Sequence, residues 1–407
     1  MKLVQALVRG WGVALCAALV GCGGGGGGDG ATSGTGTLRV ALTDAPACGF
    51  DAVNVTIEKV RLHRSANAGN DEAGWHDLPL QAPRRVNLLD LQNGVLAELG
   101  QMPLEAGRYQ QLRLVLADAG SGGGVSPESG FANSVVPMGE PERRLETPSA
   151  QQSGLKLGVD LEVRADQLVD LVLDFDACKS VLRAGQSGRY SLKPVIAVIP
   201  RFISGVRGTL QATWPSGTMV SLQQSGAVVR ATAPAPAGTT GFAAGEFLLS
   251  PVAPGTYDLV VAAPGRSTLV VTGVVVANQA VTVLNGAGSA FASVASDTGI
   301  ASGKVTITGA TEVDAVTRAL QSLAGGRTIE VAGGPVDFST GAYSHALPVG
   351  APRVAPFAAA PATLTFSDDT AAAGRYSVQA TASVGSKTVG PFAVAASAPK
   401  VNDITLP

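Results

Sequence analysis

Apolar and polar side chains alternate along much of the chain, and this period of two is typical of half-buried β-strands. The alternation predicts strands at Leu38–Leu42, Val53–His63, Tyr109–Leu116, Leu168–Phe175 and Tyr190–Ile199. Clusters of Gly, Pro, Asn and Asp separate these runs, as expected of turns. The pattern therefore favours an all-β fold class.

Some segments depart from the simple alternation. Val86–Leu91 reads as a strand, and we expect it to continue into a short helix at Val95–Leu99. Ala119–Pro148 is rich in Gly and Pro and is predicted to be the least ordered part of the first domain. Pro200–Ser204 is expected to act as a hinge, and a new series of short apolar runs begins at Val206.

The N-terminal segment has the layout of a secretory leader. Lys2 and Arg9 supply positive charge, and Trp11–Val20 is an uncharged, mostly apolar run that is too short to span a bilayer. Leu19-Val-Gly-Cys22 resembles a lipobox, the cleavage and acylation site of bacterial lipoproteins. We therefore expect residues 1–21 to be a lipoprotein signal peptide. The alternative is an ordinary secretory signal peptide that happens to end near a cysteine.

The lipobox resemblance implies that Cys22 is the lipidation site, where palmitate or similar acyl chains would bind the membrane. Residues 22–36 are mostly Gly and small polar residues, and such a linker spans roughly 20 Å as a flexible coil. In similar lipoproteins an Asp after the cysteine retains the protein at the inner membrane. Gly23 therefore favours the outer membrane, with the folded part in the periplasm or at the cell surface.

Two of the four cysteines remain after processing and acylation, since Cys16 lies in the leader and Cys22 is acylated. An even pair in an oxidising compartment predicts a disulfide bond between Cys48 and Cys178. Two separate buried thiols are the alternative.

A second resemblance concerns the part of the chain after the hinge. Gly245–Val261, with its Pro254-Gly255 turn and Tyr257 entering a strand, resembles the carboxypeptidase regulatory-like domains, which are prealbumin-like β-sandwiches. About 80 residues suit a seven-strand sandwich. Thr340–Pro348 matches the same turn and strand layout, and Gly374-Arg-Tyr376 returns later. All five tyrosines follow a glycine by two residues, so we expect them to be architectural.

The first domain resembles a bacterial lipoprotein domain family of unknown function, numbered 4382. The matching stretches are Leu42–Cys48, Val53–His63, Arg85–Leu91, Ala106–Arg113, Thr147–Leu157, Asp174–Ser180 and Leu192–Val195. The predicted organisation is a signal peptide (1–21), a Gly-rich linker (22–36), a β domain of unknown function (37–200), a β-sandwich (201–290) and a second, divergent β-sandwich (298–407). The family has no established activity, so the resemblance implies no function.

The sequence offers no catalytic set, and we expect neither enzymatic activity nor a cofactor. It has no Gly-x-Ser-x-Gly elbow, no phosphate-binding loop and no dinucleotide fingerprint. The three histidines, His63, His76 and His345, share no metal-ligand spacing, and His63 is expected at the surface. With 29 basic and 31 acidic residues the chain carries no basic excess for binding nucleic acid.

The acidic residues Asp170, Asp174 and Asp176 are weak candidates for a cation site. Asp174 and Asp176 are two positions apart, so both would project from the same face of a strand, and Ca²⁺ prefers such oxygen ligands. The alternative is that they accept turn N–H groups or pair with Lys179 and Arg183.

The sequence therefore predicts a lipid-anchored, non-enzymatic envelope protein that binds or assembles with an envelope protein partner or a glycan. The alternative is that residues 37–200 bind a glycan, a peptide or Ca²⁺. A secreted hydrolase is a third class, but only Trp75 and Trp214 are present after the leader to build a sugar-binding cleft.

Overall fold

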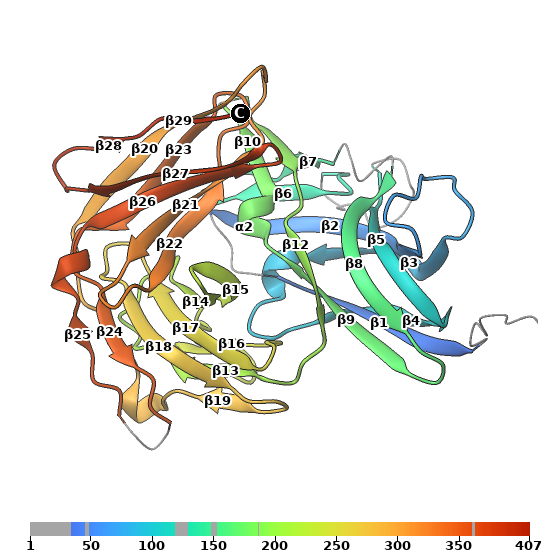
Figure 1. Cartoon of the computed structure of the whole chain (residues 1–407), viewed down its shortest axis with the longest axis horizontal. Helices are drawn as coiled ribbons and strands as arrows, with labels where there is room; N and C mark the ends of the chain where they lie inside the picture. The colour runs from blue at the N-terminus through green and yellow to red at the C-terminus, as the bar shows by residue number, and fades with distance from the viewer. Residues whose placement is uncertain (1–33, 45–48, 119–128, 148–152, 186, 360–362) are drawn as a thin grey trace, which may run out of the picture.

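The computed structural model describes residues 34–44, 49–118, 129–147, 153–185, 187–359 and 363–407, which fold almost entirely as β-strands (Figure 1). They form three successive pairs of sheets, each with its own apolar core. A short α-helix, α2 (Ala177–Ser180), lies in the first domain. Short 3₁₀ turns occur at Leu88–Asp90, Ala287–Ser289 and Thr370–Ala372. The predicted all-β, tandem-sandwich fold class is confirmed.

The first domain consists of two sheets. Its strands are β1 (Thr35–Asp44), β2 (Phe50–His63), β3 (His76–Asn87), β4 (Ala97–Glu105), β5 (Gly107–Leu116), β6 (Ser134–Pro137), β7 (Arg143–Glu146), β8 (Leu155–Val163), β9 (Leu168–Phe175), β10 (Val181–Ala184), β11 (Arg189–Leu192) and β12 (Ile196–Pro200). One sheet has the order β12-β9-β1-β4, and the other has the order β10-β11-β7-β6-β2-β5-β8 with β3 beside β2. β1 and β9 run parallel, with Leu42 opposite Leu173.

The predicted helix at Val95–Leu99 is wrong. Ala97 begins β4, which pairs antiparallel with β1 and buries Ala97 and Leu99 on one side while Glu98 is exposed. The helical turn lies earlier, at Leu88–Asp90, where the Asn87 side chain accepts a hydrogen bond from the Leu89 N–H at 3.3 Å. Pairing with β1 therefore decides the conformation of this segment, because it buries both apolar side chains.

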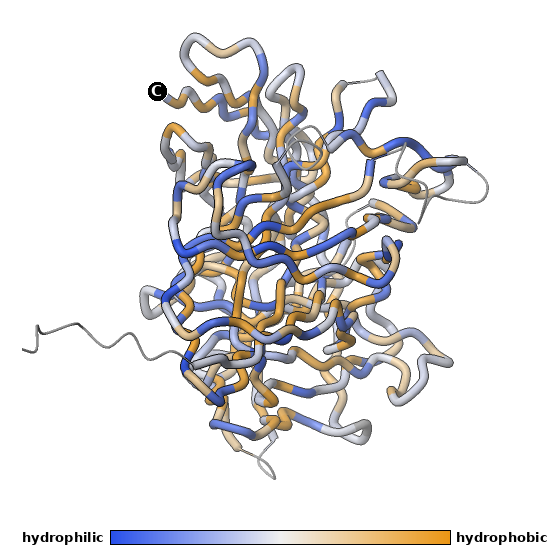
Figure 2. Tube along the Cα trace, turned by 90° about the vertical axis from the view of Figure 1, so that its right-hand side faces the viewer, coloured by the Kyte–Doolittle hydropathy of each residue, from blue (hydrophilic) through white to orange (hydrophobic). Residues whose placement is uncertain are grey.

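The second domain has seven strands between residues 205 and 283, as the sequence predicts. They are β13 (Gly205–Thr209), β14 (Met219–Gln224), β15 (Ala227–Thr232), β16 (Glu246–Leu249), β17 (Gly255–Ala262), β18 (Leu269–Val276) and β19 (Val281–Val283). One sheet has the order β16-β13-β19, and the facing sheet contains β15-β14-β17-β18. The apolar face of each strand points into the core between them, and Figure 2 shows hydrophobic stretches running mainly through the strands in the middle of the molecule.

The third domain repeats this topology. Its strands are β20 (Thr298–Ile307), β21 (Ala315–Ser322), β22 (Thr328–Pro335), β23 (Ala342–Pro348), β26 (Arg375–Ala382), β27 (Gly385–Ala393), β28 (Lys400–Val401) and β29 (Ile404–Leu406). β23, β28 and β29 pair with β20 as β16 and β19 pair with β13, and the order β22-β21-β26-β27 matches β15-β14-β17-β18.

This topology changes the alignment of the repeat. Gly374 and Tyr376, at the start of β26, correspond to Gly255 and Tyr257 at the start of β17, whereas Gly341 precedes β23 and corresponds to Gly245 before β16. The sequence comparison matched the segment around Gly341 with the one around Gly255. Both places contain a turn, a glycine and a tyrosine, so the local pattern alone does not identify the equivalent strands.

Two strands of the third domain belong to a sheet of the second. β24 (Arg353–Pro356) pairs in parallel with β18, and β25 (Ser367–Asp368) pairs with β24. The corresponding connection in the second domain, between Leu249 and Gly255, is short. The third domain therefore contains an insertion that extends the sheet of its neighbour (Figure 1).

Candidate functional site: a cavity at the junction of the three domains

A cavity of about 420 Å³ lies where the three domains meet. Its described lining residues are Gly49, Asp176, Cys178 and Lys179 from the first domain, Gly217, Thr218, Met219, Val228, Ala231 and Ala262–Gly265 from the second, and Thr298, Glu330–Gly333, Ala346 and Pro348 from the third. This volume falls in the range of small-molecule sites. A site of this kind depends on the assembly of all three domains.

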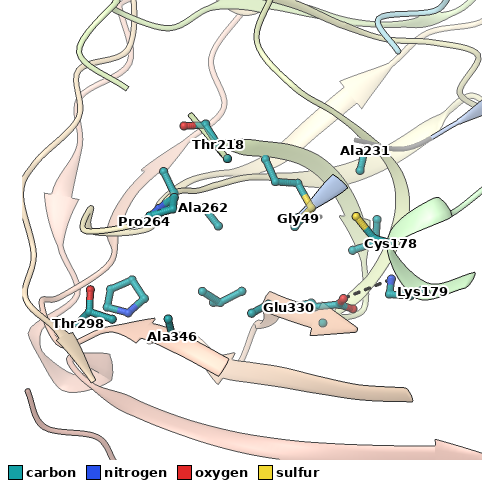
Figure 3. A pocket seen from close by; sticks show the side chains of 18 of the residues that line it. Gly49, Cys178, Lys179, Thr218, Ala231, Ala262, Pro264, Thr298, Glu330 and Ala346 are labelled. Atoms are coloured by element: carbon teal, nitrogen blue, oxygen red, sulfur yellow. Dashed lines mark ion pairs between the residues drawn. The ribbon is translucent and has the colours of Figure 1, made fainter. Parts of the chain in front are cut away.

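The walls are mainly apolar, and the charged groups gather on one side. Figure 3 shows Ala231, Ala262 and Ala346 around the cavity and the Lys179–Glu330 ion pair at one side of it. Thr218 and Thr298 lie at the opposite side. A small number of polar groups in an apolar pocket is the arrangement that orients a bound small molecule.

Glu330, on β22, links the three domains. Its side chain is only 2% exposed, accepts a 2.5 Å hydrogen bond from Nε of Arg318 and lies 3.4 Å from Nζ of Lys179 in the first domain. Its backbone N–H donates to Oε1 of Gln223 in the second domain, and its carbonyl accepts from Nε2 of Gln223, both at 2.7 Å. The buried carboxylate thus has two cationic partners, which offsets the cost of its burial.

Lys179 is positioned by α2. Asp176 begins this turn, accepting a 3.0 Å hydrogen bond from the Lys179 N–H, and its carboxylate also lies 3.1 Å from Nζ of Lys179. Burial lowers the pKa of Lys179, but the carboxylates of Asp176 and Glu330 outweigh this effect and hold its pKa above the ordinary value. The side chain is therefore a fixed ammonium and is unsuited to act as a base or nucleophile.

The three acidic candidates do not form one cation site, because each carboxylate is paired with basic side chains. Asp170 pairs with Arg39 and lies 3.8 Å from Arg201. Asp176 lies beyond the end of β9 and caps α2, so it does not share a strand face with Asp174. Among the residues that the structure describes, no group of three or more His, Cys, Asp or Glu side chains could hold a metal ion.

Asp174 joins the first domain to the second. Its carboxylate pairs with the guanidinium of Arg230, a β15 residue whose side chain is 2% exposed. Arg230 also donates from Nη2 to the hydroxyl of Thr43 at 2.7 Å. Burial raises the pKa of Asp174, and the Arg230 charge offsets only part of that effect. Asp174 thus serves as an interdomain contact, with Arg230 and not Arg183 as its partner.

The described residues include only one of the two cysteines of the predicted disulfide. Cys48 lies outside the described residues, so its pairing with Cys178 stays a prediction. Cys178 lies in α2, and both Cys178 and Gly49, the residue after Cys48, line the cavity. The chain on either side of the predicted bond therefore borders the same space.

The histidines are packed within the fold. The prediction of a surface His63 is wrong, because this residue is 7% exposed. Its Nδ1 accepts from the Ser65 N–H at 2.9 Å, which leaves Nε2 to donate to the Ala73 carbonyl at 3.0 Å. His345 is buried beside the Thr317 hydroxyl at 3.0 Å, and burial lowers its pKa to about 4.

The leader, the lipidation residue Cys22 and the Gly-rich linker lie outside the described residues, so these predictions stand on the sequence alone. Within the described ranges no helix is long and apolar enough to cross a membrane.

The charged residues that matter most at the cavity and at the contacts between domains were not found from the sequence. Glu330 and Arg230 carry no motif, and Lys179 was considered only as a partner for the acidic cluster. One signal was available for Glu330, which stands between Ile329 and Val331 in a strand where all three side chains are buried. A charge buried within such a run requires a partner.

Comparisons with solved structures give only weak similarities. The Bacillus anthracis TIE protein is 10% identical, with a TM-score of 0.15, and the match covers 92% of this chain and 50% of that one. A streptococcal ancillary pilin is 9% identical over 92% of this chain and 99% of its own, with a TM-score of 0.15. The Corynebacterium diphtheriae major pilin SpaA is 11% identical over 91% and 99%, with a TM-score of 0.16. TM-scores this low carry no argument about the present chain.

No curated protein sequence matches the chain. The first domain has a family match, however, and it spans the two sheets described above from β1 to the end of β11. Residues 35–194 match the family described as "Domain of unknown function (DUF4382)", and the first domain is similar to that family over this range.

Proposed function

We propose that the protein is a lipid-anchored envelope lipoprotein that performs a non-enzymatic binding or assembly role. The observation that carries the proposal is the lipobox-like Leu19-Val-Gly-Cys22 followed by a Gly-rich linker. Acylation at Cys22 would anchor the chain durably, because two or more acyl chains bind a bilayer far more strongly than one. Gly23 supports an outer-membrane location.

The chemistry of the cavity supports a binding role. Its ionisable side chains are committed to one another, since Lys179 is held protonated between two carboxylates and Glu330 accepts from both Lys179 and Arg318. Groups paired in this way stabilise the junction and are poor general acids or bases. The three acidic candidates, Asp170, Asp174 and Asp176, are likewise paired with arginines or Lys179, which argues against proposing a Ca²⁺ site there.

The anchor is tested by labelling growing cells with radioactive palmitate and separating the membranes on a density gradient. We expect label in the wild-type chain and in Cys16→Ala, a matched control in the leader, and none in Cys22→Ala. Gly23→Asp should move the protein to the inner membrane. A Cys22→Ala chain that stays in the outer membrane at the mature size would overturn the proposal.

A further inference from the structure

We propose that the cavity between the three domains binds an uncharged, largely apolar small molecule that carries a hydroxyl group. This inference rests on the binding role proposed above and names the ligand class of that role. The first support is the composition of the walls, where Ala, Val, Pro and Met provide half of the described lining residues and only three of the lining side chains are charged. Such walls favour an apolar body through the hydrophobic effect.

The second support is the charge balance on the polar side. Asp176 and Glu330 supply two negative charges, and Lys179 and Arg318 supply two positive ones within the same chain of contacts. A charged ligand head would leave one charge uncompensated in a largely desolvated place, which is costly. A neutral head avoids this cost.

A hydroxyl also matches the hydrogen bonds on offer. An ammonium has three N–H donors, and the structure gives Lys179 two carboxylate partners. A ligand hydroxyl is able to accept from Lys179 and donate to a carboxylate oxygen at the same time. Figure 3 places this ion pair at the wall of the cavity, where a ligand head would meet it.

The probes are three molecules with the same chain and different heads: 1-decanol, decanoate and decylamine. The protein is the chain without residues 1–22, which keeps every described residue and needs no detergent. At pH 7 we expect 1-decanol to raise the Tm and to bind at least about tenfold more tightly than either charged probe, a difference of about 1.4 kcal/mol. A preference for decanoate or decylamine, or no shift with any probe, would overturn the proposal.

Two substitutions on β23 locate the binding. Ala346 lines the cavity, so Ala346→Leu should fill part of it and weaken 1-decanol binding. Ser344 is exposed on the same face of the strand but does not line the cavity, so Ser344→Leu is the matched control and should bind as the wild type does. Equal binding by both variants would place the ligand elsewhere and contradict the assignment.

A third variant tests the charge argument. Glu330→Gln removes one negative charge and should shift the preference from 1-decanol toward decanoate. Lys179→Gln, which removes a positive charge, should shift it toward decylamine and serves if Glu330→Gln does not fold. Unchanged preferences in a folded variant would refute the role of the ion pairs. These readouts are independent of Cys22, so failure of the anchor would be distinguishable.

Discussion

Tyrosine hydroxyls donate hydrogen bonds to backbone carbonyls in all three domains. Tyr109 donates to the Glu105 carbonyl at 3.0 Å and Tyr257 to the Ala253 carbonyl at 2.9 Å, each four residues upstream, as in the tyrosine corner of β-sandwiches. Tyr376 donates to the Pro348 carbonyl at 2.8 Å. All five tyrosines are buried, which confirms the prediction that they are architectural.

Tyr257→Phe should lower the free energy of unfolding by about 1 kcal/mol, because it removes one hydrogen bond and keeps the ring in the core. Urea unfolding measures the change. Thr256→Ala, at the exposed neighbouring position, is the control and should have little effect. A Phe variant as stable as the wild type would show that water replaces the hydroxyl bond.

Acid should destabilise the third domain through His345. Its pKa of about 4 in the fold lies below the ordinary 6.5, so only the unfolded chain binds this proton between those pH values. The free energy of unfolding should therefore fall from pH 6.5 to pH 4, by about 3 kcal/mol in total. His345→Gln should flatten this slope in unfolding titrations. Measurement at pH 8, where the imidazole is neutral in both states, isolates the packing cost of the substitution.

The Cys48–Cys178 disulfide would close a loop of roughly 130 residues, and the chain-entropy argument gives it about 4–5 kcal/mol of stabilisation. Neither thiol should react with a maleimide in oxidised native protein, and Cys178→Ser should expose one reactive thiol at Cys48. Full labelling of both residues without reductant would contradict the pairing.

At the scale of the strand, two glycines perform the same task in two domains. The N–H groups of Leu210 and Val305 donate to the carbonyls of Gly245 and Gly341, both at 2.8 Å, and both glycines have positive φ. A Cβ on Gly341 would overlap the Val305 carbonyl oxygen. This close approach ties the first strand of each domain to the strand that flanks it.

Gly341→Ala should therefore destabilise the protein by about 2 kcal/mol or more, from the strain of a positive φ and from the overlap. Gly309→Ala is the matched control, because Gly309 also has positive φ but no atom lies within 4 Å of the added Cβ. Its cost should be only about 1 kcal/mol. Equal losses in thermal unfolding of the two variants would show that the overlap relaxes freely.

The strands of the first domain were predictable because burial on one face imposes a period of two, as in Val53, Val55 and Ile57. Their partners were not, since β1 lies between β4 and β9, which are far apart in the sequence. The cavity could not be predicted from the sequence for the same reason. Lys179 and Glu330 acquire their roles only when separate domains pack together.

The ion pair between Arg230 and Asp174 joins the first and second domains and is expected to contribute to the stability of the whole molecule. Arg230→Met leaves Asp174 buried without its cation and should cost about 3–5 kcal/mol. Adding Asp174→Asn should cost less than the sum of the two single changes, and a double-mutant cycle measures the difference. Arg108→Met, in the exposed pair with Asp160, is the control and should have little effect on stability, because solvent screens an exposed pair. Additive effects at Arg230 and Asp174 would contradict direct coupling.

The insertion between β23 and β26 has a consequence for how this architecture can be inherited. Because β24 covers the edge of β18, a second domain separated from the third would expose an unpaired strand edge, which invites aggregation. A gene fragment encoding either sandwich alone is thus a poor unit for duplication or recombination. Residues 205–407 are the smallest part that keeps β24 on the edge of β18, so any exchange of parts with another protein has to carry both sandwiches together.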